Sequence, residues 1–253
     1  MILENFKLTG KVAIVTGAVR GLGQGISVAL AEAGADIVGV GLGDMEETKA
    51  MVEAAGRKFL FVNADLISLE PIENIIQKTM EAFGRIDILV NNAGIIRRED
   101  SVNFSEQDWD DVMNINLKSL FFLSQAVARQ MIAQGQGGKI ISIASMLSYQ
   151  GGIRVPSYTA SKSGVKGITM TLANELAKYK INVNAIAPGY MATDNTTALR
   201  ADEQRSKEIL DRIPAARWGT PQDLAGTAVF LASSASDYVN GFTIAVDGGW
   251  LAR

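Results

Sequence analysis

The stretch Thr16-Gly17-Ala18-Val19-Arg20-Gly21-Leu22-Gly23 decides the fold class, because it joins a predicted strand to a predicted helix near the start of the chain. The strand, residues 11–16, is a β-branched run, and the helix, residues 22–33, has apolar residues at helical spacing. Glycines in such a turn let backbone N–H groups approach a phosphate at a helix N-terminus. A glycine triplet alone is weak evidence, but this context predicts a pyrophosphate site. The residues expected to form it are Gly17, Arg20, Gly21, Leu22 and Gly23.

Strand and helix patterns alternate along the rest of the chain, without a linker, a repeat or a low-complexity stretch. This alternation is typical of βαβ units, so we expect an α/β fold with a doubly wound parallel sheet, in one domain covering residues 1–253. The expected strands are residues 11–16, 36–40, 58–63, 86–90, 139–144, 181–187 and 243–246. The expected helices are residues 22–33, 46–55, 69–83, 106–133, 157–179, 196–211 and 221–231.

The composition excludes several functional classes. The chain has 253 residues, 47% of them hydrophobic and 20% charged, which is typical of a globular domain. With no cysteine and no histidine, it lacks disulfides, thiol nucleophiles, histidine triads and the usual zinc ligands, and we expect no metal site. The net charge of −3, without a long basic run, argues against nucleic acid or a membrane as a partner. Residues 1–7 show no signal-peptide pattern, so we expect a cytoplasmic protein.

Tyr158 is the best candidate for proton transfer in a chain without imidazoles and thiols. Lys162 lies four residues further on a predicted helix, so the two side chains share a face. An ammonium group beside a phenol favours the phenolate and moves the pKa of the phenol toward the working pH, and a positively charged nicotinamide ring would add to this. A tyrosine and a lysine could also share a surface helix by chance, so this pair needs support from other motifs.

Further motifs supply that support. Asn91-Asn92-Ala93-Gly94 follows the fourth predicted strand, at the carboxyl edge of the sheet where ligands of open α/β sheets bind. Together with the glycine turn, Ser145, the Tyr158/Lys162 pair and Pro188-Gly189, it resembles the short-chain dehydrogenase/reductase family, in the same order and over nearly the whole chain. The resemblance implies a Rossmann fold with about seven strands, hydride transfer with a nicotinamide cofactor, and a homotetramer.

The resemblance also implies a role for individual residues. Tyr158 matches the catalytic acid/base, Lys162 its partner that also holds the nicotinamide ribose, and Ser145 the serine that orients the substrate oxygen. Asn116 matches the asparagine that anchors a proton-relay water, with Asn114 as a nearby alternative. Further cofactor contacts are expected from Asp65, Leu66, Asn92, Ala93, Gly94, Pro188, Gly189 and Thr193.

The choice between NAD and NADP depends on the end of the second strand. A carboxylate there would bind the ribose hydroxyls of NAD, but Gly41 occupies the position, and Asp44 is the nearest substitute. Arg20 stands where some family members hold the 2′-phosphate of NADP, although no basic residue follows the strand. We expect NAD as the cofactor, with NADP possible.

Arginines near the expected pocket mouth indicate a small anionic substrate. Arg98 is the first candidate for a carboxylate contact, followed by Arg154 and Arg97, although each could be a solvated surface charge. The segments around Arg97, Ser145, Tyr190 and Trp218 and the C-terminus resemble the sugar-acid dehydrogenases of the family, which act in pectin and uronate breakdown, more than its acyl-carrier reductases. The residues expected along a substrate wall are Ser145, Met146, Leu147, Tyr149 and Gln150.

Two other interpretations stay open. The fold could serve as a cofactor sensor or scaffold without catalysis, but proteins that lose activity usually lose the tyrosine or the lysine, and this chain has all four catalytic residue types. An acyl-carrier reductase would need a basic docking face, which the net charge of −3 does not suggest. The helices at 106–133 and 157–179 carry more apolar surface than one sheet face needs, which fits the homotetramer.

Overall fold

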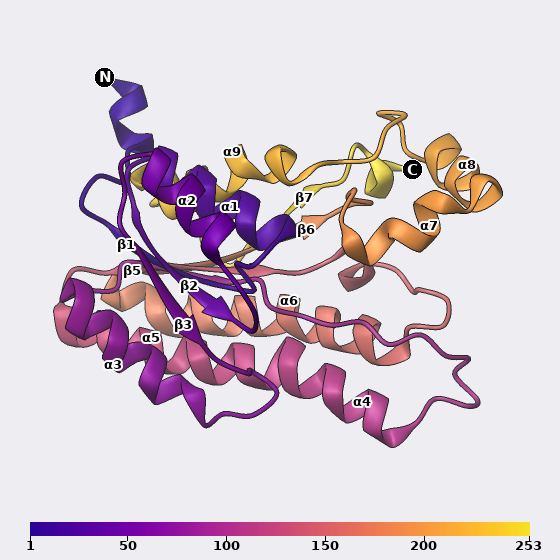
Figure 1. The fold of residues 1–253 in the computed structure, drawn as a ribbon, viewed down its shortest axis with the longest axis horizontal. Coiled ribbons are helices and arrows are strands. Elements are labelled where there is room, and N and C mark those ends of the chain that lie inside the picture. Colours follow the sequence, from indigo (N-terminus) through magenta and orange to yellow (C-terminus); the bar gives the residue numbers. More distant parts are fainter.

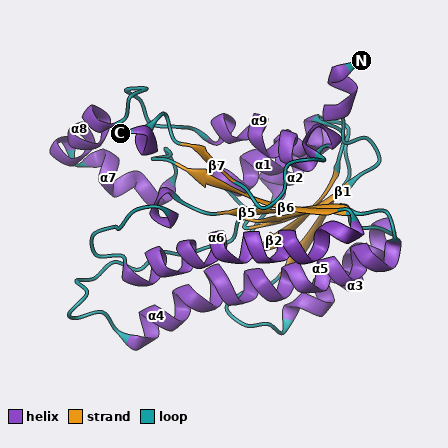
Figure 2. Ribbon diagram, turned by 180° about the vertical axis from the view of Figure 1, so that it is seen from behind, coloured by secondary structure: helices purple, strands orange, loops and turns teal.

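A central parallel sheet organises the molecule, and helices cover both of its faces (Figures 1 and 2). The structure is a computed structural model that describes residues 1–253, apart from the side chain of Asn195. The seven strands are ordered β3-β2-β1-β4-β5-β6-β7 and pair in parallel throughout, which confirms the expected Rossmann arrangement. The strands are β1 Val12–Thr16, β2 Asp36–Gly41, β3 Phe59–Asn63, β4 Ile88–Asn91, β5 Gly138–Ile143, β6 Ile181–Pro188 and β7 Thr243–Val246.

The helices form two layers. The helices α1, α2 and α9 lie on one face of the sheet, and α3, α4, α5 and α6 lie on the other (Figures 1 and 2). Their bounds are α1 Gly21–Glu32, α2 Glu46–Ala54, α3 Pro71–Phe83, α4 Glu106–Met113, α5 Leu120–Gln134, α6 Pro156–Leu176, α7 Thr197–Ala201, α8 Glu203–Arg212 and α9 Pro221–Ala232. Helices α7 and α8 lie together beyond the strand ends, beside the C-terminus (Figure 1).

The central strands are buried on both faces, as strands of a doubly covered sheet must be. In β1, Ala13 and Val15 belong to the core under α1 and α9, whereas Val12 and Ile14 belong to the core under α3, α5 and α6. All five residues of β1 are buried. This explains why the strands read as continuous apolar runs in the sequence.

Two predicted helices are divided in the structure. The stretch expected at 106–133 contains a π-helical segment, η2, at Asn114–Ser119 between α4 and α5. The stretch expected at 196–211 breaks at Asp202, whose extended backbone ends α7 and whose carboxylate caps α8 by accepting from the N–H of Arg205. The second break is a local capping effect, whereas the first lies where Asn116 bonds to residues distant in sequence, Ile95 and Ser161.

The strand order places the site. Strands β1 and β4 are neighbours, although β2 and β3 lie between them in sequence and leave on the other side. The loops after β1 and β4 therefore diverge at the carboxyl edge of the sheet and leave a crevice between them.

Candidate active site

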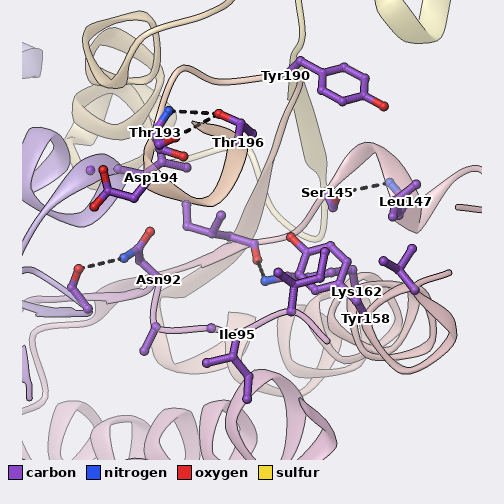
Figure 3. A pocket seen from close by; sticks show the side chains of 18 of the residues that line it. Asn92, Ile95, Ser145, Leu147, Tyr158, Lys162, Tyr190, Thr193, Asp194 and Thr196 are labelled. Atoms are coloured by element: carbon purple, nitrogen blue, oxygen red, sulfur yellow. Dashed lines mark hydrogen bonds between the residues drawn. The ribbon is translucent and has the colours of Figure 1, made fainter. Parts of the chain in front are cut away.

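A pocket of about 1000 Å³ opens at the carboxyl edge of the sheet. Its walls come from the loops after the first six strands, from the start of α6, and from α7, α8 and the C-terminal segment. A cavity of this size accommodates a dinucleotide and a small second molecule together. Figure 3 shows how side chains from these separate segments converge on it.

The glycine turn forms one end of the pocket. Gly17 and Gly21 adopt left-handed φ angles of +66° and +59°, which favour glycine. A Cβ atom on Gly23 would lie 2.1 Å from the carbonyl oxygen of Gly17, so no larger residue fits there. The N-cap residue of α1, Arg20, makes no side-chain capping bond, which leaves the first N–H groups of the helix available to an anion.

Asn92 joins this turn to the end of β4. Its Nδ2 donates to the carbonyl oxygens of Thr16 at 2.9 Å and Gly17 at 3.2 Å, and the Thr16 hydroxyl accepts from the N–H groups of Asn92 and Ala93. Figure 3 shows Asn92 with one of its bonds dashed. These bonds hold the two loops of the crevice together. Asn92, Ala93 and Gly94 all line the pocket, as the sequence predicts.

The loops after β2 and β3 border the same end of the pocket. Gly41, Asp44, Asp65 and Leu66 line it. The carboxylate of Asp44 accepts from the N–H of Glu46 at 2.8 Å, so it supports the start of α2 while remaining exposed to the pocket. Asp65 accepts in the same way from the N–H of Ile67 at 3.0 Å.

Arg20 points toward the loop after β6. Its Nε lies 3.1 Å from the carboxylate of Asp194, and both side chains are exposed at the pocket rim. Thr193, the preceding residue, has its methyl group 3.7 Å from the position of a Cβ on Gly21, and its N–H donates to Thr196 (Figure 3). The predicted contact segments of α1 and β6 thus face each other.

Of the remaining residues expected to contact the cofactor, one lines the pocket and two lie behind its surface. Gly189 lines the pocket, and a Cβ there would lie 2.6 Å from the backbone of Asp247, so β6 and the segment after β7 approach too closely for a side chain. Pro188 and Gly23 do not line the pocket surface. Pro188 ends β6 and Gly23 permits the tight turn, so both shape the backbone behind the pocket.

Ser145 stands at the end of β5, where it begins the short 3-10 helix η3 (Met146–Ser148). Its Oγ accepts from the N–H of Leu147 at 3.2 Å, and its hydroxyl acts on Tyr158 as a donor that lowers the pKa of the phenol. The Leu147 N–H occupies one lone pair of the Ser145 hydroxyl oxygen. The hydroxyl proton is left to donate to Tyr158 or to a substrate oxygen beside it. Both residues line the pocket.

Burial raises the pKa of Tyr158, and this differs from the sequence-based expectation. Desolvation of the phenolate is the largest effect, whereas the hydrogen bond from Ser145 and the charge of Arg98 lower the pKa. Lys162 acts elsewhere: its Nζ donates to the carbonyl oxygen of Ile143 at 2.6 Å (Figure 3). Arg98 therefore joins Lys162 as a cation near Tyr158, and its charge favours the phenolate.

Lys162 is almost fully buried, and burial lowers its pKa to about 8. Its Nζ lies 5.6 Å from the centroid of the Tyr158 ring, and both side chains line the pocket. A lysine this buried keeps its charge at neutral pH at a cost in stability, and such costs are concentrated at functional sites.

Asn116 lies inside the π-helical segment η2. Its Oδ1 accepts from the N–H of Ile95 at 2.9 Å, and its Nδ2 donates to the Ile95 carbonyl at 3.0 Å and to Ser161 at 3.2 Å. The side chain is fully buried behind the pocket wall. It therefore connects the loop after β4 to α6, one turn from Tyr158. This favours Asn116, over the only partly buried Asn114, as the asparagine of the expected catalytic tetrad Asn116, Ser145, Tyr158 and Lys162.

The three mouth arginines have different surroundings. Arg98 lines the pocket and acts electrostatically on Tyr158. Arg97 pairs with Asp108 and Asp111 of α4, at 3.2 and 3.3 Å. Arg154 pairs with Asp100 at 3.1 Å, and neither it nor Arg97 lines the pocket, so the structure brings only Arg98 to the reacting groups.

More residues line the part of the pocket expected to hold the substrate than the sequence predicts. Met146, Leu147 and Gln150 line it as expected, whereas the hydroxyl of Tyr149 donates to the backbone of Thr243 outside the pocket. Residues that the sequence analysis did not place there also line it: Tyr190, Arg205, Glu208, Ile209, Arg212 and Trp250. Local patterns mark α8 as a helix but do not reveal that one of its faces turns toward the pocket.

The sequence pattern of the family described as enoyl-(acyl carrier protein) reductase matches residues 17–251, which covers the glycine turn, the tetrad and the C-terminal segment. The chain belongs to the short-chain dehydrogenase/reductase family. This family consists of oxidoreductases that use NAD or NADP, and the glycine cradle and the pocket volume described above fit such a dinucleotide.

Individual relatives of the short-chain dehydrogenase/reductase family are similar over the full chain. The chain is 69% identical to 2-dehydro-3-deoxy-D-gluconate 5-dehydrogenase of Dickeya dadantii and 68% identical to the protein of that name from Escherichia coli, with complete coverage of both chains in each pair. A crystal structure of a gluconate 5-dehydrogenase from Burkholderia cenocepacia, in complex with NADP and tartrate, is 39% identical, with a TM-score of 0.94 and complete coverage of both chains.

Proposed function

We propose that this short-chain dehydrogenase interconverts the C5 hydroxyl and the C5 ketone of 2-dehydro-3-deoxy-D-gluconate, an acid of uronate and pectin breakdown. The meeting of Ser145, Tyr158 and Arg98 in one pocket carries the chemical part of the proposal, because it presents a donor, a proton acceptor and a cation to one substrate oxygen. The two relatives with this name support the choice of substrate, since they are 69% and 68% identical over the whole chain.

In this proposal, Tyr158 and Ser145 act on the reacting oxygen, and the other site residues would position the cofactor. In oxidation, the Tyr158 phenolate accepts the proton of the C5 hydroxyl while Ser145 donates a hydrogen bond to the same oxygen. In reduction, Tyr158 returns the proton. Lys162 and the turn at Asn92–Gly94 would hold the nicotinamide ribose and ring next to that carbon, with Thr193 and Gly189 on the other side. When bound, the nicotinamide accepts or supplies the hydride. Asn116 would support a water that connects the site to solvent.

We propose NAD as the preferred cofactor, with NADP also accepted. Asp44 lies on the pocket lining near the expected adenosine ribose and offers a carboxylate for its hydroxyls. No side chain projects from Gly41, and a Cβ there would lie 3.1 Å from the end of the Met45 side chain, so the end of β2 does not repel a 2′-phosphate. Arg20 at the rim could contact that phosphate after leaving Asp194.

We further propose a cytoplasmic homotetramer. Exposed apolar side chains support it: Trp109 on α4, Phe122 on α5 and Met170 on α6 are each more than a third exposed on the same layer of helices. Phe242 and Tyr238 are more exposed still, beside the edge strand β7. Surface of this kind is costly in an isolated chain and is usually covered by a partner. None of the described helices is long and apolar enough to span a membrane.

Gluconate 5-dehydrogenase activity is the second candidate, because the Burkholderia cenocepacia structure with this name has the same fold over its full length. Acyl-carrier reduction is the third, from the description of the matching family. Initial rates of the purified protein with 2-dehydro-3-deoxy-D-gluconate, D-gluconate and an acyl-carrier ketone, each with both cofactors, decide among them. The highest kcat/KM should be for 2-dehydro-3-deoxy-D-gluconate, and a higher value for another compound would reassign the substrate. Absence of turnover with every compound would leave the scaffold interpretation.

A further inference from the structure

One face of α8 lies against the substrate wall. Arg205, Glu208, Ile209 and Arg212 all line the pocket and share a side of the helix at intervals of three and four residues. Arg205 and Glu208 pair at 2.9 Å, so their charges offset each other. Among the side chains that the structure describes, no carboxylate lies within ion-pair distance of Arg212.

Arg212 is held by uncharged partners. The carbon of its guanidinium lies 3.9 Å from the centroid of the Trp250 ring, and its Nη2 donates to Oε1 of Gln150 at 3.3 Å. Trp250 donates through Nε1 to the same oxygen at 3.2 Å. A guanidinium that stacks by its face on an indole keeps its remaining edge N–H groups available in the plane, where a carboxylate binds in the two-pronged manner.

Gln150 offers a second donor beside the guanidinium. Because Arg212 and Trp250 both donate to its Oε1, the orientation of the amide is fixed, and the structure shows no partner for its Nε2 among the described residues. The backbone N–H of Gln150 donates to the carbonyl of Met146 at 3.2 Å, directly after Ser145. The Gln150 donor therefore lies about one turn along the chain from Ser145, which is expected to orient the reacting oxygen.

Arg98 is less suited to hold the carboxylate. Its positive charge lowers the pKa of Tyr158, and an anion bound to it would cancel much of that effect and raise the pKa again. A carboxylate bound at α8 leaves the charge of Arg98 to act on Tyr158. The two arginines can then have separate tasks, one on the reacting oxygen and one on the far end of the substrate.

We propose that Arg212 and Gln150, held by Trp250, bind the carboxylate of the sugar acid and make Arg212 the residue that selects acids over uncharged sugars. This inference rests on the proposed function of the same pocket. It moves the carboxylate contact from Arg98, the arginine that the sequence favours, to a helix far along the chain. Trp250 is a positioning residue in this arrangement, because it acts through Arg212.

The test compares matched substrates in Arg212→Gln. The probes are 2-dehydro-3-deoxy-D-gluconate and its methyl ester, which differ in charge but share the reacting carbon. KM for the acid should rise roughly 10- to 100-fold, the range expected for losing a charge-assisted hydrogen bond, while kcat and the KM for the ester stay close to wild type. Lys207→Gln, on the same helix but paired with Asp211 outside the pocket, removes the same charge and should change neither KM.

Further variants separate position from charge. Arg212→Lys should recover only part of the affinity for the acid, because an ammonium lacks the flat fork, and Trp250→Leu should raise KM for the acid by a smaller factor. NADH binding should be unchanged in all of them, which shows that the fold is intact. If Arg212→Gln affects acid and ester equally, or neither, the proposal is wrong.

A binding measurement keeps this result separate from the proposed reaction. D-gluconate and D-glucitol differ only in the carboxylate, and their dissociation constants from the complex with NADH can be measured without turnover, because the reduced cofactor cannot accept a hydride from them. Wild type should prefer gluconate, and Arg212→Gln should lose that preference. A wild-type enzyme that shows this preference but does not oxidise 2-dehydro-3-deoxy-D-gluconate contradicts the proposed substrate and supports the carboxylate site. Equal binding of gluconate and glucitol by wild type contradicts the carboxylate site.

Discussion

Lys162 and Tyr158 share the pocket, with the lysine Nζ 5.6 Å from the centroid of the tyrosine ring, and the lysine directs its hydrogen bond to the carbonyl of Ile143. Burial raises the pKa of the tyrosine and lowers that of the lysine to about 8, so it disfavours the charged form of each. Ser145 and Arg98 act in the opposite direction on Tyr158. The protein alone therefore holds the phenol protonated, and the charge of a bound oxidised nicotinamide would favour the phenolate.

Tyr158→Phe should lower kcat by roughly 10²- to 10⁴-fold, because it removes the group that moves the proton. The dissociation constant of NADH, measured by fluorescence titration, should stay within a few fold of wild type. A variant that retains more than about a tenth of the activity would rule out Tyr158 as the acid/base, since general acid/base groups contribute more than this.

Lys162→Met should stabilise the unliganded fold at neutral pH while abolishing activity. The pKa of Lys162 falls from 10.5 to about 8 on folding, so keeping the charge buried costs about 3 kcal/mol below pH 8, less the value of its bond to Ile143. Between pH 8 and 10.5 the folded lysine is neutral while the unfolded one still binds a proton. The stability of wild type relative to the variant should therefore rise with pH across this window.

Urea unfolding of both proteins at pH 7, 8, 9 and 10 measures that difference. Comparison with the variant cancels the titration of the other groups. A stability difference that does not change between pH 8 and 10 would contradict the lowered pKa of the buried lysine.

Arg98→Gln should affect the acid and its methyl ester alike. Removing the guanidinium takes away a charge that lowers the pKa of Tyr158, so the pH profile of oxidation should move to higher pH. At neutral pH, kcat/KM should fall roughly 10- to 100-fold for both substrates. A loss confined to the acid would instead assign the carboxylate to Arg98 and contradict the division of roles with Arg212.

Gly41→Asp should sharpen the choice of cofactor. The new carboxylate would bind the ribose hydroxyls of NAD and repel the 2′-phosphate of NADP, so the ratio of kcat/KM for NAD over NADP should rise roughly 10-fold. The flexible end of Met45 has to move, since it lies 3.1 Å from the new Cβ. Gly41→Asn controls for this shift without the charge. A wild-type ratio that favours NADP would make Arg20 the phosphate contact and overturn the preference for NAD.

Local patterns in the sequence were enough to predict the parallel sheet and to single out the Tyr158/Lys162 pair, whereas Ser145 and Asn116 were expected from the family resemblance. Continuous apolar strands, glycines at tight turns and a tyrosine–lysine pair at helical spacing each reflect short-range constraints. The π-helical segment around Asn116 was missed because it depends on hydrogen bonds to Ile95 and Ser161, distant in sequence. The wall formed by Arg212 and Trp250 was missed for the same reason: 38 residues separate the two along the chain, and only the folded C-terminus brings them together.

In the proposed reaction, Tyr158 and Ser145 act on the oxygen at C5 of a sugar acid while that carbon is oxidised. The most direct measurement is a ¹³C NMR analysis of 2-dehydro-3-deoxy-D-gluconate incubated with NAD and either wild type or Tyr158→Phe. Wild type should produce a new ketone at C5 in step with NADH formation, and the variant should leave the substrate unchanged. Oxidation at another carbon, or an equal yield from the variant, would contradict the account.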